Sequence, residues 1–221
     1  MSIRVSEEVI EYVKKKFREL KDRVNIYFFE SEECKSCDQI AEILDLLKGL
    51  SPKITVRRLS SDSPEAKRFS IDLFPAILIH GREEYNVRYF GAPLGYEFGV
   101  IVEDIVDASR GEPKLRADLL EKVRREVDRK VRIMVFVTPT CPYCPRAVRA
   151  AHKMAMANRN IYSDGIEALE FRDLAEKYDV FAVPKTVVHV DDEPVVEFEG
   201  ALPDTVFIER VIDAIKLARP R

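Results

Sequence analysis

The chain carries one short pattern twice, and this repetition limits the folds that it can adopt. The pattern is a cysteine pair with two residues between its members, and it occurs as Cys34/Cys37 and Cys141/Cys144. The two pairs are offset by 107 residues, and the apolar stretch at 24–29 matches 131–136 at the same offset. A repeat of about half the chain predicts two copies of one small fold.

The repetition continues downstream of the cysteines, where the offset grows to 109 residues. The matched positions are Phe69 and Tyr178, Ile71 and Val180, Pro75 and Pro184, His80 and His189, and Gly91 and Gly200. The change fits one two-residue insertion in the second half, between its cysteine pair and Pro184. A length of 221 residues is typical of two domains. Because Gly111 and Pro113 interrupt the helical pattern, we expect domains at 1–112 and 113–221, joined by a short linker and packed on each other.

Each half shows the same order of hydrophobic patterns. The first half predicts helices at 7–20, 38–47, 64–69 and 99–108 and strands at 24–29, 54–59, 76–79 and 85–90. The second half predicts helices at 115–127, 146–156, 171–178 and 206–218 and strands at 131–137, near 166–169, at 186–190 and at 195–198. This order predicts an α/β fold in which each half has a central mixed β-sheet flanked by helices.

The composition excludes several classes of protein. The chain is 46% hydrophobic and 34% charged with a net charge of −3, which favours a packed core and gives no reason to expect a nucleic acid partner. It has no apolar run near the length that crosses a membrane, and its first residues lack the apolar stretch of a signal peptide. We therefore expect a soluble cytoplasmic protein without a membrane partner. Asn and Gln together number only five, and with so many charged residues this bias is typical of heat-adapted proteins.

Each cysteine pair follows a strand and precedes a helix, which gives it a specific chemistry. A cysteine at a helix N-terminus is favoured as the thiolate, because backbone N–H groups and the helix dipole stabilise an anion there. A second cysteine one turn into the helix is close enough to form a disulfide with it. Such a pair can attack a substrate disulfide and then resolve the mixed disulfide. We expect Cys34 and Cys141 to be the nucleophiles and Cys37 and Cys144 to be the resolving thiols.

The residues around the two pairs predict unequal reactivity. Pro142 suits the first position of a helix, and no carboxylate lies beside the second pair. The first pair follows a run of acidic residues that raise a thiol pKa, whereas Lys35 lies within the pair and lowers it. The acidic residues are Glu30, Glu32 and Glu33. We therefore expect Cys141 to be the more acidic nucleophile.

Two prolines complete the repeated pattern, because Pro75 and Pro184 lie 41 and 43 residues after the first cysteine of their halves. Each follows an apolar residue and precedes a strand. A cis bond there would leave the backbone of Phe74 and Val183 free to pair with an extended substrate. Tyr143 either contacts the substrate or shields the dithiol, and the sequence leaves both roles open.

These motifs resemble the thioredoxin-like superfamily in tandem. Cys-Pro-Tyr-Cys at 141–144 is similar to the glutaredoxin-type site, and the stretches 138–145 and 182–186 resemble the second unit of archaeal protein disulfide oxidoreductases. The resemblance covers essentially the whole chain and is strongest after position 131. It implies two thioredoxin folds side by side, cis prolines, and dithiol–disulfide exchange on proteins: reduction, formation or isomerisation.

The same resemblance implies the cofactors and partners. The redox groups would be the disulfides Cys34–Cys37 and Cys141–Cys144, with no other cofactor and no metal. The partners would be protein disulfide substrates and a thioredoxin-reductase-like flavoenzyme as the electron donor.

The chain departs from the family pattern in two places. Many thioredoxins carry a buried acid six residues before the first cysteine, where this chain has Phe28 and Val135. The proton of the resolving thiol must therefore pass to water or to another carboxylate. The tryptophan that often precedes the thioredoxin motif is also missing, since the chain contains no Trp.

Other interpretations of the motifs remain open at this point. Each pair could be a structural disulfide, although so short a loop contributes little stability. Four cysteines could share a zinc ion, although the two pairs are far apart for a zinc site of this type. The chain could instead be an electron-transfer module that supplies a peroxiredoxin, or a chaperone with unused dithiols. We expect His80 and His189 to share a packing role, and we expect His152 to lie too far along its helix from Cys144 to act as a base.

Overall fold

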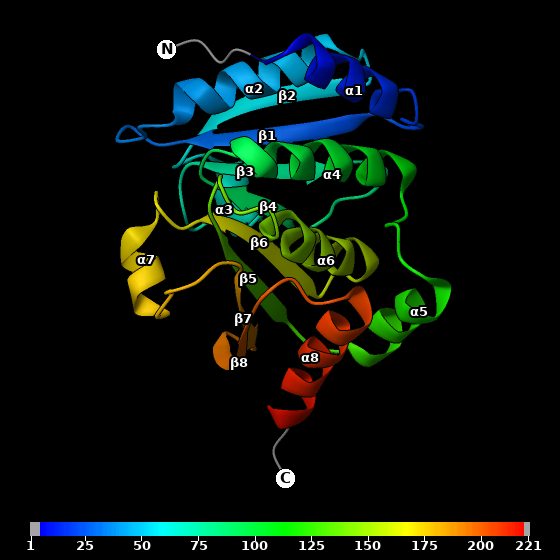
Figure 1. The fold of residues 1–221 in the computed structure, drawn as a ribbon, viewed down its shortest axis with the longest axis vertical. Coiled ribbons are helices and arrows are strands. Elements are labelled where there is room, and N and C mark those ends of the chain that lie inside the picture. Colours follow the sequence, from blue (N-terminus) through cyan, green and yellow to red (C-terminus); the bar gives the residue numbers. More distant parts are fainter. Residues whose placement is uncertain (1–4, 219–221) are drawn as a thin grey trace.

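The computed structural model, which describes residues 5–218, joins both halves through one eight-stranded sheet (Figure 1). The first half contains α1 (Glu7–Phe17), β1 (Val24–Glu30), α2 (Cys37–Gly49), β2 (Ile54–Ser60), α3 (Pro64–Arg68), β3 (Ala76–His80), β4 (Val87–Phe90), the 3₁₀ turn η1 (Gly95–Glu97) and α4 (Phe98–Arg110). The second half contains α5 (Ala117–Glu126), β5 (Val131–Val137), α6 (Cys144–Ala157), β6 (Ile161–Glu167), α7 (Arg172–Lys177), β7 (Lys185–Val190), β8 (Glu193–Glu199) and α8 (Asp204–Leu217). The mixed α/β class predicted from the sequence is confirmed.

The strand order places both cysteine pairs at the same edge of the sheet. The order is β2-β1-β3-β4-β6-β5-β7-β8, and the two halves meet where β4 pairs with β6. β1 and β4 are both antiparallel to β3, while β4, β6 and β5 are mutually parallel. β1 and β5 therefore end at the same edge, with three strands between them. At about 4.8 Å per strand spacing, the two ends lie roughly 20 Å apart.

The second strand of the second half is not where the sequence predicted it. β6 spans Ile161–Glu167 rather than a stretch near 166–169. Its first residue pairs with Val131, just as Ile54 pairs with Val24 in the first half. The offset of 107 residues thus holds through β6, and the two extra residues follow it: one lies before α7 and one lengthens α7 itself.

The hydrophobic pattern did not locate β6 correctly because the residues of this strand are suited to contacts between the two halves. Gly165 faces the ring of Tyr89 from β4, and a Cβ at this glycine would lie 2.6 Å from Tyr89 Cδ2. On the opposite face, the fully buried Asp164 accepts from Arg88 Nε (2.7 Å) and from Arg132 Nε (2.6 Å). Glycine and aspartate are unusual in strand interiors, and here tertiary contacts override that preference.

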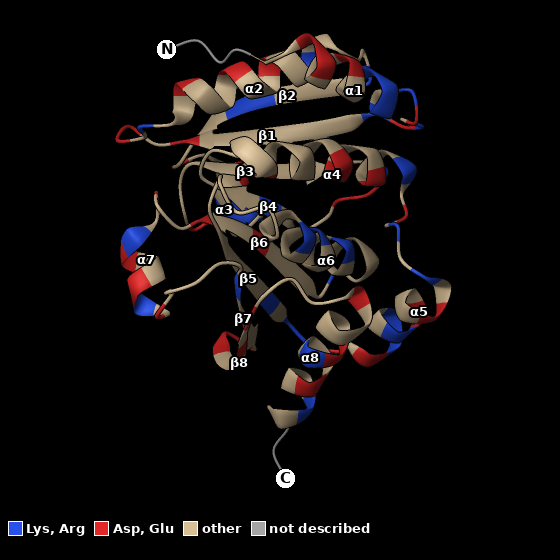
Figure 2. Ribbon diagram, in the orientation of Figure 1, with Lys and Arg blue, Asp and Glu red and all other residues tan. Residues whose placement is uncertain are grey.

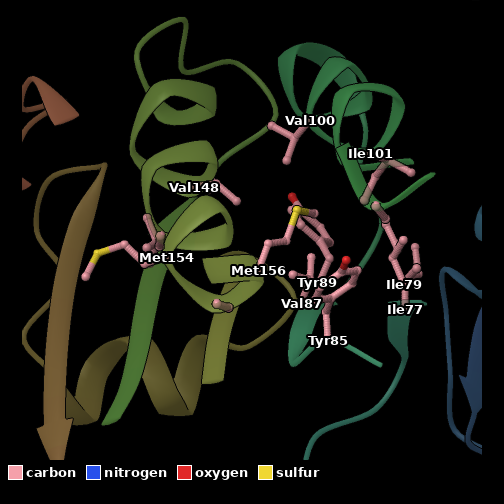
Figure 3. Packing of buried hydrophobic residues seen from close by; sticks show 14 of the residues in the cluster. Ile77, Ile79, Tyr85, Val87, Tyr89, Val100, Ile101, Val148, Met154 and Met156 are labelled. Carbon is pink, nitrogen blue, oxygen red and sulfur yellow. The ribbon is translucent and has the colours of Figure 1, made fainter. Parts of the chain in front are cut away.

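Apolar side chains and a buried ionic network fill the space above the join. Figure 3 shows Tyr89 of β4 among Val100 of α4 and Val148 and Met156 of α6. On the same two helices, Arg149 pairs with Asp104 and Asp107, and His152 Nδ1 lies 2.6 Å from Asp104 Oδ2. The helices α4 and α6 therefore hold the two halves together over one face of the sheet. No helix among residues 5–218 is long and apolar enough to cross a membrane.

Candidate active sites

The first cysteine pair forms a disulfide in the turn between β1 and α2. Cys37 is the first residue of α2 and is buried, whereas Cys34 lies three residues before the helix and is partly exposed. The sequence had placed the first cysteine at the helix N-terminus and the second one turn inside. In the structure both cysteines lie about one turn earlier than this, because the helix begins only at Cys37. The exposed member of the pair is still the one expected to meet a substrate.

The second pair, Cys141 and Cys144, forms the matching disulfide before α6. The backbone N–H of Cys144 donates to Cys141 Sγ (3.1 Å), so a helix N-terminal donor is already aimed at the expected nucleophile. No bond of this kind reaches Cys34 Sγ in the part of the chain that the structure describes. Pro142 was expected at the first helical position, but it precedes the helix, and Pro145 occupies the first turn instead.

Each disulfide lies near a proline whose preceding peptide bond is cis. The bonds Phe74–Pro75 and Val183–Pro184 are both cis, as the resemblance implied. At the second site Cys141 Sγ lies 3.8 Å from Val183 O. Neither Phe74 nor Val183 donates its backbone N–H within the described residues. Both donors are therefore available to an extended polypeptide laid along the proline.

Exposed apolar side chains surround the second site. Tyr143 is 69% exposed and Phe181 is 90% exposed. A groove of about 530 Å³ lies beside Val183 and is lined in part by Leu169, Arg172 and Phe181. The exposure of Tyr143 favours the first of its two expected roles, because a side chain that points into solvent is placed to contact a substrate rather than to shield the dithiol.

The first site opens into a larger groove that the second half helps to form. This groove has a volume of about 900 Å³, and Cys34, Phe74 and Pro75 line one side of it. The segment from Leu169 to Leu174, which includes the start of α7, lines the other side. A substrate that reaches Cys34 therefore contacts both halves of the chain.

The acidic surroundings expected for the first site are present in part. Figure 2 shows acidic residues where β1 ends and in the loop that follows it. Glu30 accepts two hydrogen bonds from Arg58 across β1 and β2, at 3.1 and 2.5 Å, and this pairing offsets its charge. Glu32 and Glu33 remain exposed to solvent beside Cys34. The solvent-exposed acidic residues beside Cys34 therefore belong to the loop itself.

Sequence reasoning missed Glu97, which lies in η1 of the first half, next to a residue that contacts the loop before Cys141. The neighbouring Tyr96 N–H donates to Pro139 O (3.1 Å), two residues before Cys141, and η1 packs against α6. Glu97 is fully buried, and neither of its carboxylate oxygens has a hydrogen-bond partner among the described residues. Burial raises the pKa of Glu97 to about 8. No motif contains this residue, so only the pairing of the two halves reveals it.

The structure also bears on the shared zinc site considered above and on the packing role expected for two histidines. The four cysteines lie in two separate disulfides, and no group of three or more potential metal ligands occurs among residues 5–218. His80 packs edge-on against Tyr27 and Phe69, and His189 packs edge-on against Tyr178. These contacts agree with the packing role expected for both histidines.

The fold is similar to solved structures that carry thioredoxin-like units in tandem. Residues 131–213 match the family model described as a thioredoxin domain. A protein disulfide oxidoreductase from Aeropyrum pernix K1 superposes with a TM-score of 0.84 and 27% identity, over 97% of this chain and 95% of that one. A structure of the alkylhydroperoxide reductase protein AhpF from Enterococcus faecalis also has a TM-score of 0.84, with 21% identity over 94% of this chain and 99% of that one.

The curated sequence relatives belong to the second of these two groups. An alkyl hydroperoxide reductase subunit of Pseudomonas aeruginosa, which corresponds to AhpF, is 29% identical over 150 residues, covering 66% of this chain and 27% of that protein. The corresponding protein of Staphylococcus aureus is 28% identical over 160 residues, which cover 71% of this chain and 29% of that protein. This chain thus spans less than a third of the length of these relatives. Together with the geometry above, the comparisons identify two thioredoxin-like folds in tandem, each with a Cys-x-x-Cys disulfide.

Proposed function

We propose that the chain is a protein dithiol–disulfide oxidoreductase with two active pairs. The observation that carries this proposal is the repeated arrangement of a disulfide near a cis proline whose preceding residue has a free N–H. An extended polypeptide can pair with that backbone and thereby bring its own disulfide or thiol beside the nucleophile. The substrates would be protein disulfides or dithiols.

The exchange at the second site follows from the roles proposed for its cysteines. In the reduced pair, the Cys141 thiolate attacks one sulfur of a substrate disulfide, and the other substrate sulfur leaves as a thiolate that takes up a proton. Cys144 then loses its proton and attacks Cys141 Sγ, which releases the second substrate thiol. The substrate gains two electrons, and the pair returns to the disulfide form. Cys34 and Cys37 would perform the same steps at the first site.

Glu97 is the proton acceptor that we propose for Cys144. The position six residues before Cys141 is the buried, apolar Val135, so it cannot take the proton. Glu97 has a buried carboxyl without a partner among the described residues, and its pKa of about 8 is close to that of a thiol. A matched pKa lets the proton pass between the two groups with little free-energy difference. The acid that thioredoxins place on a strand is thus replaced by one from the opposite half.

A second candidate function is an electron-transfer module that supplies a peroxiredoxin. The likeness to the alkyl hydroperoxide reductase proteins favours it. In both functions we propose a thioredoxin-reductase-like flavoenzyme as the electron donor. Reduction of a peroxiredoxin without reduction of general protein disulfides would favour the second function.

The remaining expectations from the sequence stay proposals. We propose a cytoplasmic location, a heat-adapted source and structural units at 1–112 and 113–221. The last division is supported by the end of α4 at Arg110 and the start of α5 at Ala117.

Dithiothreitol-dependent reduction of insulin tests the proposed function. The native chain should accelerate the precipitation of insulin, and the double variant Cys34→Ser/Cys141→Ser should not. A folded native chain that leaves insulin unreduced, but suppresses its aggregation equally well without its cysteines, would indicate the chaperone function instead.

A further inference from the structure

The hydroxyl of Ser36, inside the first cysteine pair, is held by a carboxylate from the opposite half of the chain. Ser36 is only 7% exposed, and its Oγ donates to Glu170 Oε2 at 2.5 Å. The other carboxylate oxygen, Glu170 Oε1, accepts from the N–H of Ala92 at 2.6 Å. Both oxygens are therefore occupied, and the carboxylate is fixed between the first dithiol and the join of the two halves.

The hydrogen bond of Ser36 is unusual for its place in the helix. Ser36 immediately precedes α2, where a serine hydroxyl ordinarily accepts a hydrogen bond from an N–H of the first turn. The structure contains no such side-chain cap at this position. The hydroxyl instead donates to Glu170, so the residue gives up a stabilising contact within its own helix for a contact with the second half.

The segment that carries Glu170 is the one that differs in length between the two halves. One of the two inserted residues lies in the segment between β6 and α7, which contains Glu170, and the other lengthens α7. Ala168 N–H, at the start of the segment, donates to Val137 O at the end of β5 (2.9 Å). At the far side, a Cβ on Gly91 would lie 2.9 Å from Glu170 Oε1, and the φ of Gly91 is +89°. The insertion and the glycine together let the carboxylate reach the first site.

Glu170 and Cys34 line the same groove. The other charged residues along this groove are Glu33 and Lys35 on the loop of Cys34, and Arg172 and Asp173 from the second half. Among the carboxylates of this group, Glu170 is the one that is bonded to a residue of the cysteine pair. A negative charge fixed at Ser36, two residues from Cys34 in the same loop, opposes a second negative charge on Cys34, because like charges disfavour each other.

We propose that Glu170 is a positioning residue of the first dithiol, which fixes the loop of Cys34 through Ser36 and opposes formation of the Cys34 thiolate. The second half of the chain thereby sets the reactivity of the first. Because a destabilised thiolate disfavours the reduced form, Glu170 also makes the first pair a stronger reductant. This inference rests on the dithiol role proposed above for Cys34.

The test is a titration of Cys34 in the full chain, reduced and carrying Cys141→Ser and Cys144→Ser so that the first pair reports alone. The rate of alkylation against pH gives the pKa of the nucleophile. Glu170→Gln should lower the pKa of Cys34 by roughly half a unit to one unit, as expected for removal of a nearby charge. Ser36→Ala keeps the charge and should give a smaller shift. Glu193→Gln, an exposed carboxylate of the second half at the other end of the sheet, should give none.

Three results would overturn the inference: an unchanged pKa in Glu170→Gln, an equal shift in Ser36→Ala, or an equal shift in Glu193→Gln. The reduction potential of the Cys34–Cys37 pair against glutathione is a second measurement, and it should rise in Glu170→Gln. Neither measurement uses a protein substrate. A chain that fails to reduce insulin but shows the shifted pKa would therefore reject the proposed function and retain this inference.

Discussion

The two dithiol sites share a strand, a helix and a cis proline, but they differ in the acid that accompanies them. At the first site Glu170 is hydrogen-bonded to the cysteine loop and opens to a groove. The acid proposed for the second site, Glu97, is fully buried and has no hydrogen-bond partner in the described part of the chain. In both cases the acid comes from the other half. The two copies thus share the strand, helix and cis proline of the site, while the segments where the halves meet give each copy a different acid.

The difference has a direct cause in the strand order. β4 and β6 are the strands that join the halves, and each is followed by a segment that crosses to the opposite half. The segment after β4 carries η1, with Glu97, against α6 of the second half, and the segment after β6 carries Glu170 to the first site. β2 and β8 lie at the outer edges, so the segments beside them have no second site to reach.

The largest expected effect comes from removing one nucleophile at a time. Cys141→Ser should lower the rate at which insulin is reduced to about a tenth or less of the native rate, whereas Cys34→Ser should retain more than about half of it. The reason is that, among the described residues, a backbone N–H that stabilises a thiolate reaches only the Cys141 sulfur. The initial rates of insulin precipitation give the comparison. Equal losses in the two variants would contradict a principal second site.

The next effect is a slower second site without its proposed proton acceptor. In a chain that carries Cys34→Ser and Cys37→Ser, Glu97→Gln should slow exchange by about tenfold, within the range of general acid–base effects. The same substitution in the chain that lacks Cys141 and Cys144 is the control and should leave the first site unchanged. A similar loss in both backgrounds would indicate structural damage rather than a lost proton acceptor.

A third effect is on stability against pH. The pKa of Glu97 is about 8 in the folded chain and ordinarily 4.5, so between these values the folded state holds a proton that the unfolded state releases. The native chain should therefore lose stability as the pH rises through this window. The loss should be about 1 kcal/mol between about pH 6.5 and 7.5. Urea unfolding at the two pH values should show this loss in the native chain and a smaller one in Glu97→Gln; equal losses would contradict the assignment.

A smaller effect is the difference between the two nucleophiles themselves. The pKa of Cys141 should lie about half a unit below that of Cys34, because its sulfur accepts the Cys144 N–H and no exposed acid precedes it. Alkylation rates against pH, measured on each pair with the other replaced by serine, give the two values. A lower value for Cys34 would reverse the predicted order.

The smallest effect concerns Lys35, which is exposed within the first pair. Lys35→Met should raise the pKa of Cys34 by a few tenths of a unit, since an exposed cation in water exerts only a weak and salt-screened field. Repeating the titration in high salt should remove most of the difference. A salt-independent shift would point to a changed loop conformation.

The sequence predicted much of the fold because the repeated residues are the ones that build it. The strands, the helices and the prolines recur at fixed offsets, and hydrophobic patterning locates most elements to within a few residues. β6 is the exception, since Asp164 and Gly165 are tolerated there only because Arg88, Arg132 and Tyr89 lie against them. A pattern read along one strand does not reveal such neighbours.

The sequence also predicted part of each candidate site. The cysteines and prolines belong to motifs, so the sequence reveals them, and the structure places them together at each site. Glu97, Ser36 and Glu170 belong to no motif, and each matters through a partner in the other half. Contacts across the join depend on how two folds meet, which is information that neither copy of the repeat contains.

The pairing of β4 with β6 also has a consequence for any attempt to separate the halves. If the chain were cut in the linker after α4, the first fragment would expose a row of unpaired backbone N–H and C=O groups along β4. The second fragment would expose a similar row along β6. Each fragment would also leave Arg88 or Asp164 without its buried partner. Bare strands of this kind are templates for self-association. The fragments should therefore aggregate or dimerise when expressed alone and recover solubility when produced together.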